Sequence, residues 1–113
     1  MREADHRATA EELEQTIQQL QSIGGSPRVI IETAWGAGYH WTAYGCQRKY
    51  GKHSDKHQGL VKYLEGLNET WAADIWRDFE VVRTGGWYGH QHTQNNVQQA
   101  LTLLANLRNR ATM

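Results

Sequence analysis

The segment 29–46 constrains the fold more than any other part of the chain. Its first half, 29–35, is rich in β-branched residues, and its second half, 39–46, alternates aromatic with small residues. The glycine-flanked stretch 36–38 separates the two halves. β-Branched and aromatic residues favour strands, and a short connection containing glycine is typical of a hairpin. The segment therefore predicts two antiparallel strands.

Other segments carry apolar residues at helical spacing, and they predict helices. Thr9 and Glu12 form a capping-box pattern before the first helix, and Gly24, Gly25 and Pro27 mark its end. Thr93 is placed to cap the last helix. In chain order, the predicted helices cover about 10–23, 54–67, 71–76 and 94–108.

A third strand is predicted over 79–83, and the glycine-rich stretch 85–89 predicts a turn or the start of a fourth strand. So few strands cannot bury their own apolar face, so helices should cover the sheet. We therefore expect an α+β fold, with a small, mainly antiparallel sheet of three to four strands packed against helices. The expected order is α-β-β-α-(α)-β-α, with 1–8 as a flexible N-terminal lead and 9–113 as a single domain.

Charge and cysteine content narrow the classes of protein. Lys+Arg and Asp+Glu number 12 each, so the net charge is zero with neutral histidines, which makes a nucleic-acid partner unlikely on electrostatic grounds. No apolar run is long enough for a membrane span, and the first residues lack the apolar core of a secretory signal. Cys46 is the sole cysteine, which favours a reducing setting, and we expect a cytoplasmic protein without membrane contact.

Aromatic side chains supply the main candidates for a binding site. The chain has five Trp and five Tyr against one Phe, and Trp and Tyr suit pocket walls and interfaces because they join an apolar body to a polar atom. Ordinary core packing and base stacking are the other uses of such rings. The candidate ligand or interface residues are Trp35, Tyr39, His40, Trp41, Tyr44, Trp87, Tyr88, His90 and His92.

Catalytic and metal-binding patterns are weak in this chain. His90 and His92 would share one face of a strand and could join His40 around zinc, nickel or copper, but any His-x-His sequence matches this spacing. Cys46 would need a positioned base to act as a nucleophile, and a buried structural cysteine is the commoner case. We expect no metal and no cofactor.

These patterns favour a small binding or interaction protein, non-enzymatic, with an aromatic-rich pocket or interface. The alternative is a small-molecule enzyme or ligand-binding fold with a cavity lined by His, Trp and Tyr, and a weaker one is a nucleic-acid-binding regulator. Ten Trp and Tyr residues exceed what a small core encloses, so a homodimer is expected, with a protein or a small molecule as the further partner.

Overall fold

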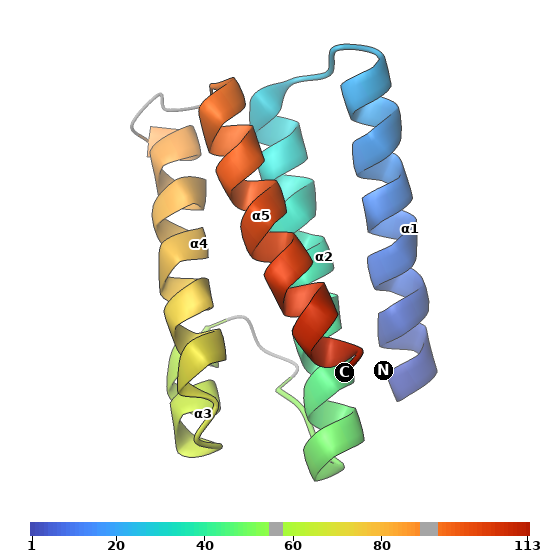
Figure 1. Cartoon of the computed structure of the whole chain (residues 1–113), viewed down its shortest axis with the longest axis vertical. Helices are drawn as coiled ribbons and strands as arrows, with labels where there is room; N and C mark the ends of the chain where they lie inside the picture. The colour runs from blue at the N-terminus through green and yellow to red at the C-terminus, as the bar shows by residue number, and fades with distance from the viewer. Residues whose placement is uncertain (55–57, 89–92) are drawn as a thin grey trace.

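Helices alone make up the regular structure of the computed structural model, which describes residues 1–54, 58–88 and 93–113, with side chains as far as Gly85 in the second range (Figure 1). No strand occurs among these residues. In chain order the helices are α1 (Glu3–Ser22), α2 (Pro27–Tyr50), α3 (Leu60–Gly66), α4 (Thr70–Tyr88) and α5 (Gln94–Ala111).

The predicted α+β fold is therefore wrong. Both strands of the expected hairpin, 29–35 and 39–46, lie within α2, and the stretch 36–38 continues that helix without a turn. The expected third strand, 79–83, and residues 85–88 of the expected turn belong to α4.

The position of α2 explains this error. α2 contacts α1, α4 and α5, and Figure 1 shows it between α1 on one side and α4 on the other. Ile31, Trp35, Tyr39, Trp41 and Tyr44 are all buried, although they point in different directions around the helix. A helix buried on all sides has no polar face, so the periodicity that identifies a helix is lost. What remains in the sequence is a β-branched and aromatic composition, which predicts strands.

Glycines in α2 serve close packing. A Cβ atom on Gly38 would lie 3.0 Å from Leu107 Cδ1 and 3.3 Å from Phe79 Cε2, so α5 and α4 approach the α2 backbone there. A Cβ atom on Gly45 would lie 3.1 Å from Ala111 Cα, near the C-terminal end of α5. These two positions set how closely α5 packs along α2.

The ends of the helices agree better with the local sequence signals than the predicted strands do. α1 begins at Glu3, so Thr9 lies inside the helix and cannot cap it. Gly24 adopts the predicted left-handed conformation, with φ of 66°, whereas Pro27 starts α2 at its first turn, where a missing N–H costs nothing. The predicted cap at Thr93 is confirmed, because its hydroxyl accepts a bond from the Asn96 amide in a capping box.

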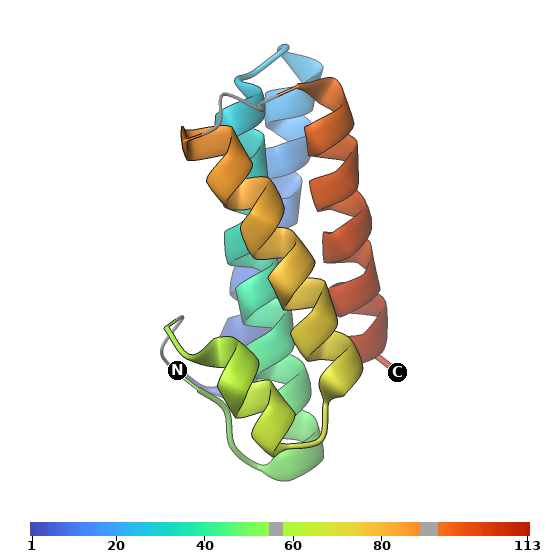
Figure 2. The same cartoon turned by 90° about the vertical axis from the view of Figure 1, so that its left-hand side faces the viewer.

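The second half of the chain departs from the predicted boundaries. α3 starts at Leu60, after Gly59, and not directly after Ser54. The short helix expected over 71–76 is the beginning of α4, which crosses α2 obliquely in Figure 2. None of the helices in the described ranges is both long and apolar enough to cross a bilayer.

Replacing Gly38 with valine should lower the free energy of unfolding by about 1–3 kcal/mol, because the new side chain overlaps Leu107 and Phe79. Gly66→Ala is the matched control, since its Cβ would meet no atom within 4 Å. The control should raise stability by up to about 1 kcal/mol through helix propensity. Urea denaturation measures both values, and an unchanged midpoint for Gly38→Val would contradict this packing.

Candidate functional site

The predicted aromatic residues of α2 divide between two sides of the helix. Trp35 and Tyr39 stack with centroids 6.4 Å apart, and Tyr39 contacts His40 edge to face. Trp41 and Tyr44 contact each other edge to face at 5.8 Å, toward α1. The structure therefore does not gather the predicted set around one concavity.

Polar partners fix the second pair against α1. The Trp41 indole N–H donates to Glu14 Oε2 at 2.7 Å, and Arg7 donates to the Tyr44 hydroxyl at 3.1 Å. Arg108 of α5 also donates to Glu14, at 2.6 Å, so this carboxylate joins three helices. Buried indoles and phenols commonly satisfy their polar atoms in this way.

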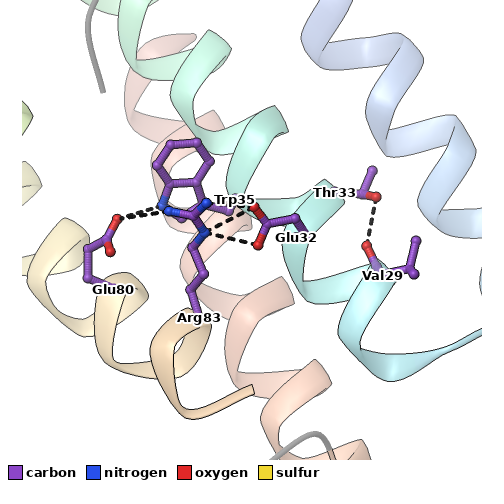
Figure 3. Close-up of polar contacts among 6 residues, drawn as sticks. All are labelled: Val29, Glu32, Thr33, Trp35, Glu80 and Arg83. Atoms are coloured by element: carbon purple, nitrogen blue, oxygen red, sulfur yellow. Dashed lines mark hydrogen bonds and ion pairs between the residues drawn. The ribbon is translucent and has the colours of Figure 1, made fainter. Parts of the chain in front are cut away.

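Of the first pair, Trp35 belongs to a charged network between α2 and α4 (Figure 3), whereas the Tyr39 hydroxyl donates to the Ser54 carbonyl at 2.6 Å. The Arg83 guanidinium lies 4.3 Å from the centre of a Trp35 ring and donates to both oxygens of Glu32, at 2.7–3.0 Å. The Trp35 indole N–H donates to Glu80 at 2.9 Å. A groove of about 400 Å³ adjoins this network, with Trp76 and Leu60 in its walls. Because these polar groups bind one another, their evident role is to join α2 to α4.

Three histidines from distant parts of the chain meet beside Tyr39. His6 Nδ1 lies 2.9 Å from His40 Nδ1, and His6 Nε2 lies 3.1 Å from His53 Nε2. His53 Nδ1 lies 2.8 Å from the Gln47 side-chain oxygen. His6 is only 2% exposed. Sequence reasoning did not find this cluster, because His6 was assigned to the N-terminal lead and His53 lies 47 positions further along the chain.

Each nitrogen–nitrogen contact in this histidine trio holds one proton, since one ring must donate and the other accept. The two contacts therefore hold two protons, and the remaining ring nitrogens of His40 and His53 hold at most one each.

The other predicted site residues fall outside the description. Trp87 and Tyr88 lie in the last turn of α4, but their side chains are not described, and His90 and His92 lie in the undescribed range 89–92. The proposed grouping of these two histidines with His40 thus lies outside the described residues. Over 1–54, 58–88 and 93–113, no three His, Cys, Asp or Glu side chains form a group that could hold a metal.

A pocket between α2, α4 and α5 is the best-formed candidate for a binding site, and we call it the Glu69 pocket. Its volume is about 80 Å³. The apolar walls come from Trp41, Leu64, Trp71, Ala72 and Leu107. The polar groups come from Thr42, Cys46, Lys49, Tyr50, Glu69 and Arg110.

Glu69 is the main polar group of this pocket, and it is 7% exposed. Its carboxylate accepts bonds from Lys49 Nζ at 2.7 Å, from the Trp71 indole at 2.5 Å and from the Tyr50 hydroxyl. Burial alone would raise the pKa of Glu69, but these bonds outweigh burial and lower the pKa. The pocket therefore contains an ionised carboxylate beside apolar walls.

Cys46 lies in the same pocket and is 7% exposed. Burial raises the pKa of its thiol to about 11, and the Glu69 carboxylate adds to the rise. Since the thiolate is the nucleophile, the thiol is inert at neutral pH. This agrees with its interpretation as a buried structural cysteine.

Of the pocket residues, sequence analysis selected only Trp41 as a ligand-binding candidate. The polar stretch 68–70 before an apolar helix was the one available signal for Glu69, because acidic residues favour helix starts. Nothing in the sequence links Glu69 to Lys49 and Tyr50, which lie about twenty positions earlier.

Cys46 should react slowly with iodoacetamide in the native protein at pH 7.5, and fast after denaturation in urea. Burial and the raised pKa both suppress the thiolate. Mass spectrometry of the alkylated chain measures both rates. Equal rates in the two states would show that the thiol is accessible and ionised, contrary to the structure.

Comparisons with known proteins add no functional assignment. No protein-family model matches the chain, and neither the comparison with curated proteins nor that with solved structures gave a match. The function therefore has to be argued from the geometry of the described residues.

Proposed function

We propose that the protein is a small-molecule-binding protein whose ligand occupies the Glu69 pocket. The observation that carries this proposal is the pocket volume of about 80 Å³ beside a buried carboxylate. A water molecule needs roughly 10–15 Å³, whereas pockets that enclose a whole drug-sized ligand reach about 300 Å³ or more. The pocket thus has room for part of a compact organic molecule, and the rest would lie outside it.

The lining supports the same proposal. Trp41 and Trp71 offer flat apolar walls, while Lys49, Tyr50, Glu69 and Arg110 place polar atoms at the same pocket. A mostly apolar concavity with a few convergent polar groups and shifted pKa values is the usual form of a ligand site. As the first residue before α4, Glu69 also stabilises that helix, but this role leaves the cavity beside it unexplained.

The proposal keeps the expected non-enzymatic binding role, but its pocket contains only Trp41 of the expected aromatic set. The inert Cys46 thiol does not act as a nucleophile in the pocket.

Homodimerisation stays a prediction, although its original reason is weaker: Trp35, Trp41 and Trp76 are each at most 5% exposed within a single chain. Light scattering measures the mass of the protein in solution, and a dimer would have twice the 13.0 kDa mass of the chain.

Titration with neutral aromatic probes tests the proposed function. Benzyl alcohol and benzamide should cause saturable changes in ¹H–¹⁵N spectra, concentrated on the indole signals of Trp41 and Trp71 and on backbone amides around the pocket. The Trp71→Phe variant identifies the Trp71 indole signal. Absence of saturable shifts up to the solubility limit of both probes would contradict the proposal.

A pocket-filling variant gives the matched comparison. Ala72 is 2% exposed and lines the pocket, so Ala72→Leu should weaken binding of both probes at least about fivefold by occupying the space they need. Ala8→Leu, on the exposed side of α1, should leave binding unchanged. Circular dichroism verifies that both variants are folded. Equal affinities in the two variants would show that the probes bind elsewhere.

A further inference from the structure

Two cationic residues, Lys49 and Arg110, line the Glu69 pocket, and a third, Arg48, lines a neighbouring concavity. A second, wider concavity of about 420 Å³ adjoins the pocket and is lined by Gly45, Arg48, Lys49, Arg110, Ala111 and Met113. Four of these residues, Gly45, Lys49, Arg110 and Ala111, also line the Glu69 pocket. The two spaces therefore lie side by side: the Glu69 pocket has mainly apolar walls, and the second concavity, which we call the vestibule, has cationic ones.

The ends of two helices create this vestibule. The close approach of α5 to Gly45 places Ala111 beside the last turns of α2, and Figure 1 shows the end of α5 alongside the later half of α2. Arg48 donates to the Ala111 carbonyl at 2.8 Å, and the Arg110 guanidinium lies 4.6 Å from the centre of a Trp71 ring. Arg110 is thus held at the pocket itself, while Arg48, whose guanidinium also lies 5.4 Å from the centre of the Tyr44 ring, is held at the adjoining concavity.

The charge balance favours a single negative charge on the ligand. Arg48, Lys49 and Arg110 oppose one carboxylate, that of Glu69. The C-terminal ends of α2 and α5 contribute about −0.5 each, and the N-terminal end of α4 contributes about +0.5. Roughly one to two positive charges remain on these side chains and helix ends, and a free terminal carboxylate at Met113, which lines the vestibule, lowers this by one. The balance therefore suits a monoanion at most, and Glu69 disfavours a more highly charged group.

The geometry of the guanidinium N–H donors narrows the chemical class of the ligand further. A guanidinium has five N–H donors, and the bonds seen among the described residues use one in Arg48, to Ala111, and one in Arg110, to the Met113 sulfur. Planar guanidinium groups bind planar carboxylates well because two N–H groups can face two oxygens. We infer that the Glu69 pocket takes a small aromatic or branched carboxylate, its apolar body between Trp41 and Trp71 and its carboxylate against Arg48 and Arg110.

This inference rests on the proposed function, and a matched pair of probes separates the two. Benzoate and benzamide have nearly the same shape but differ in charge at pH 7. Benzoate should bind at least about tenfold more tightly at low salt, because charge-assisted hydrogen bonds are the stronger ones. Added sodium chloride should weaken the binding of benzoate and leave the affinity for benzamide nearly unchanged, since the vestibule is exposed to solvent and its charges are screened by salt.

Arginine variants identify the anion contact. Arg48→Gln should lower the affinity for benzoate about three- to tenfold and change the affinity for benzamide less than about twofold. Arg110→Gln should also lower the affinity for benzoate. It should lower the affinity for benzamide slightly, because Arg110 also stacks on Trp71. Lys62→Gln removes an equal charge from the exposed surface of α3 and should change neither affinity.

The outcomes are distinct. Tighter binding of benzoate that depends on Arg48 supports the carboxylate assignment. Equal binding of the two probes, or equal effects of Arg48→Gln and Lys62→Gln, overturns the assignment and leaves the proposed function standing. Binding of neither probe overturns both.

Discussion

Burial of the central part of α2 on all sides is the constraint on which the rest of the structure depends, although residues near its ends, such as Val29 and Lys49, are exposed. Its 24 residues span about 36 Å at 1.5 Å per residue, which is nearly the full 39 Å length of the molecule. α1, α4 and α5 each pack directly on it. Its large side chains then have to fill the spaces between these neighbours, while Gly38 and Gly45 let α5 approach closely. Where an indole is buried, a partner satisfies its N–H, as Thr42 does for Trp76.

The candidate site follows from the same packing. α5 lies against α2 at Gly45, so the last turns of both helices meet near the start of α4. Glu69 then faces Lys49 and Tyr50, and the cost of burying its charge is offset by three hydrogen-bond donors. The cationic residues that favour helix C-terminal ends come together at the opening of the pocket. An ordinary preference of helix ends thereby produces a surface suited to an anion.

Local signals in the sequence predicted some features well. The cap at Thr93 and the apolar stripe of α5 depend on residues a few positions apart, and both are present in the structure. The hairpin over 29–46 was wrong because the environment of α2, which no local pattern records, decides its conformation. Gly36 and Gly38 then suggested a turn, although Gly38 serves a close contact with α5.

The site was predictable only in part, for a related reason. Composition correctly drew attention to Trp41, which lines the Glu69 pocket. It also selected Trp35 and Tyr44, which the fold uses to join α2 to α4 and α1. Glu69 and Lys49 lie 20 positions apart, and His6 and His53 lie 47 apart, so their contacts depend on the complete arrangement of helices.

Nuclear magnetic resonance of the segment 29–46 tests the central role of α2 most directly. The account predicts helical chemical shifts and sequential amide contacts that continue without interruption through 36–38. It also predicts that amides in the middle of α2 exchange with solvent only through global unfolding, because this helix is enclosed by its neighbours. Cross-strand contacts between 29–35 and 39–46, or fast exchange at 36–38, would contradict the account.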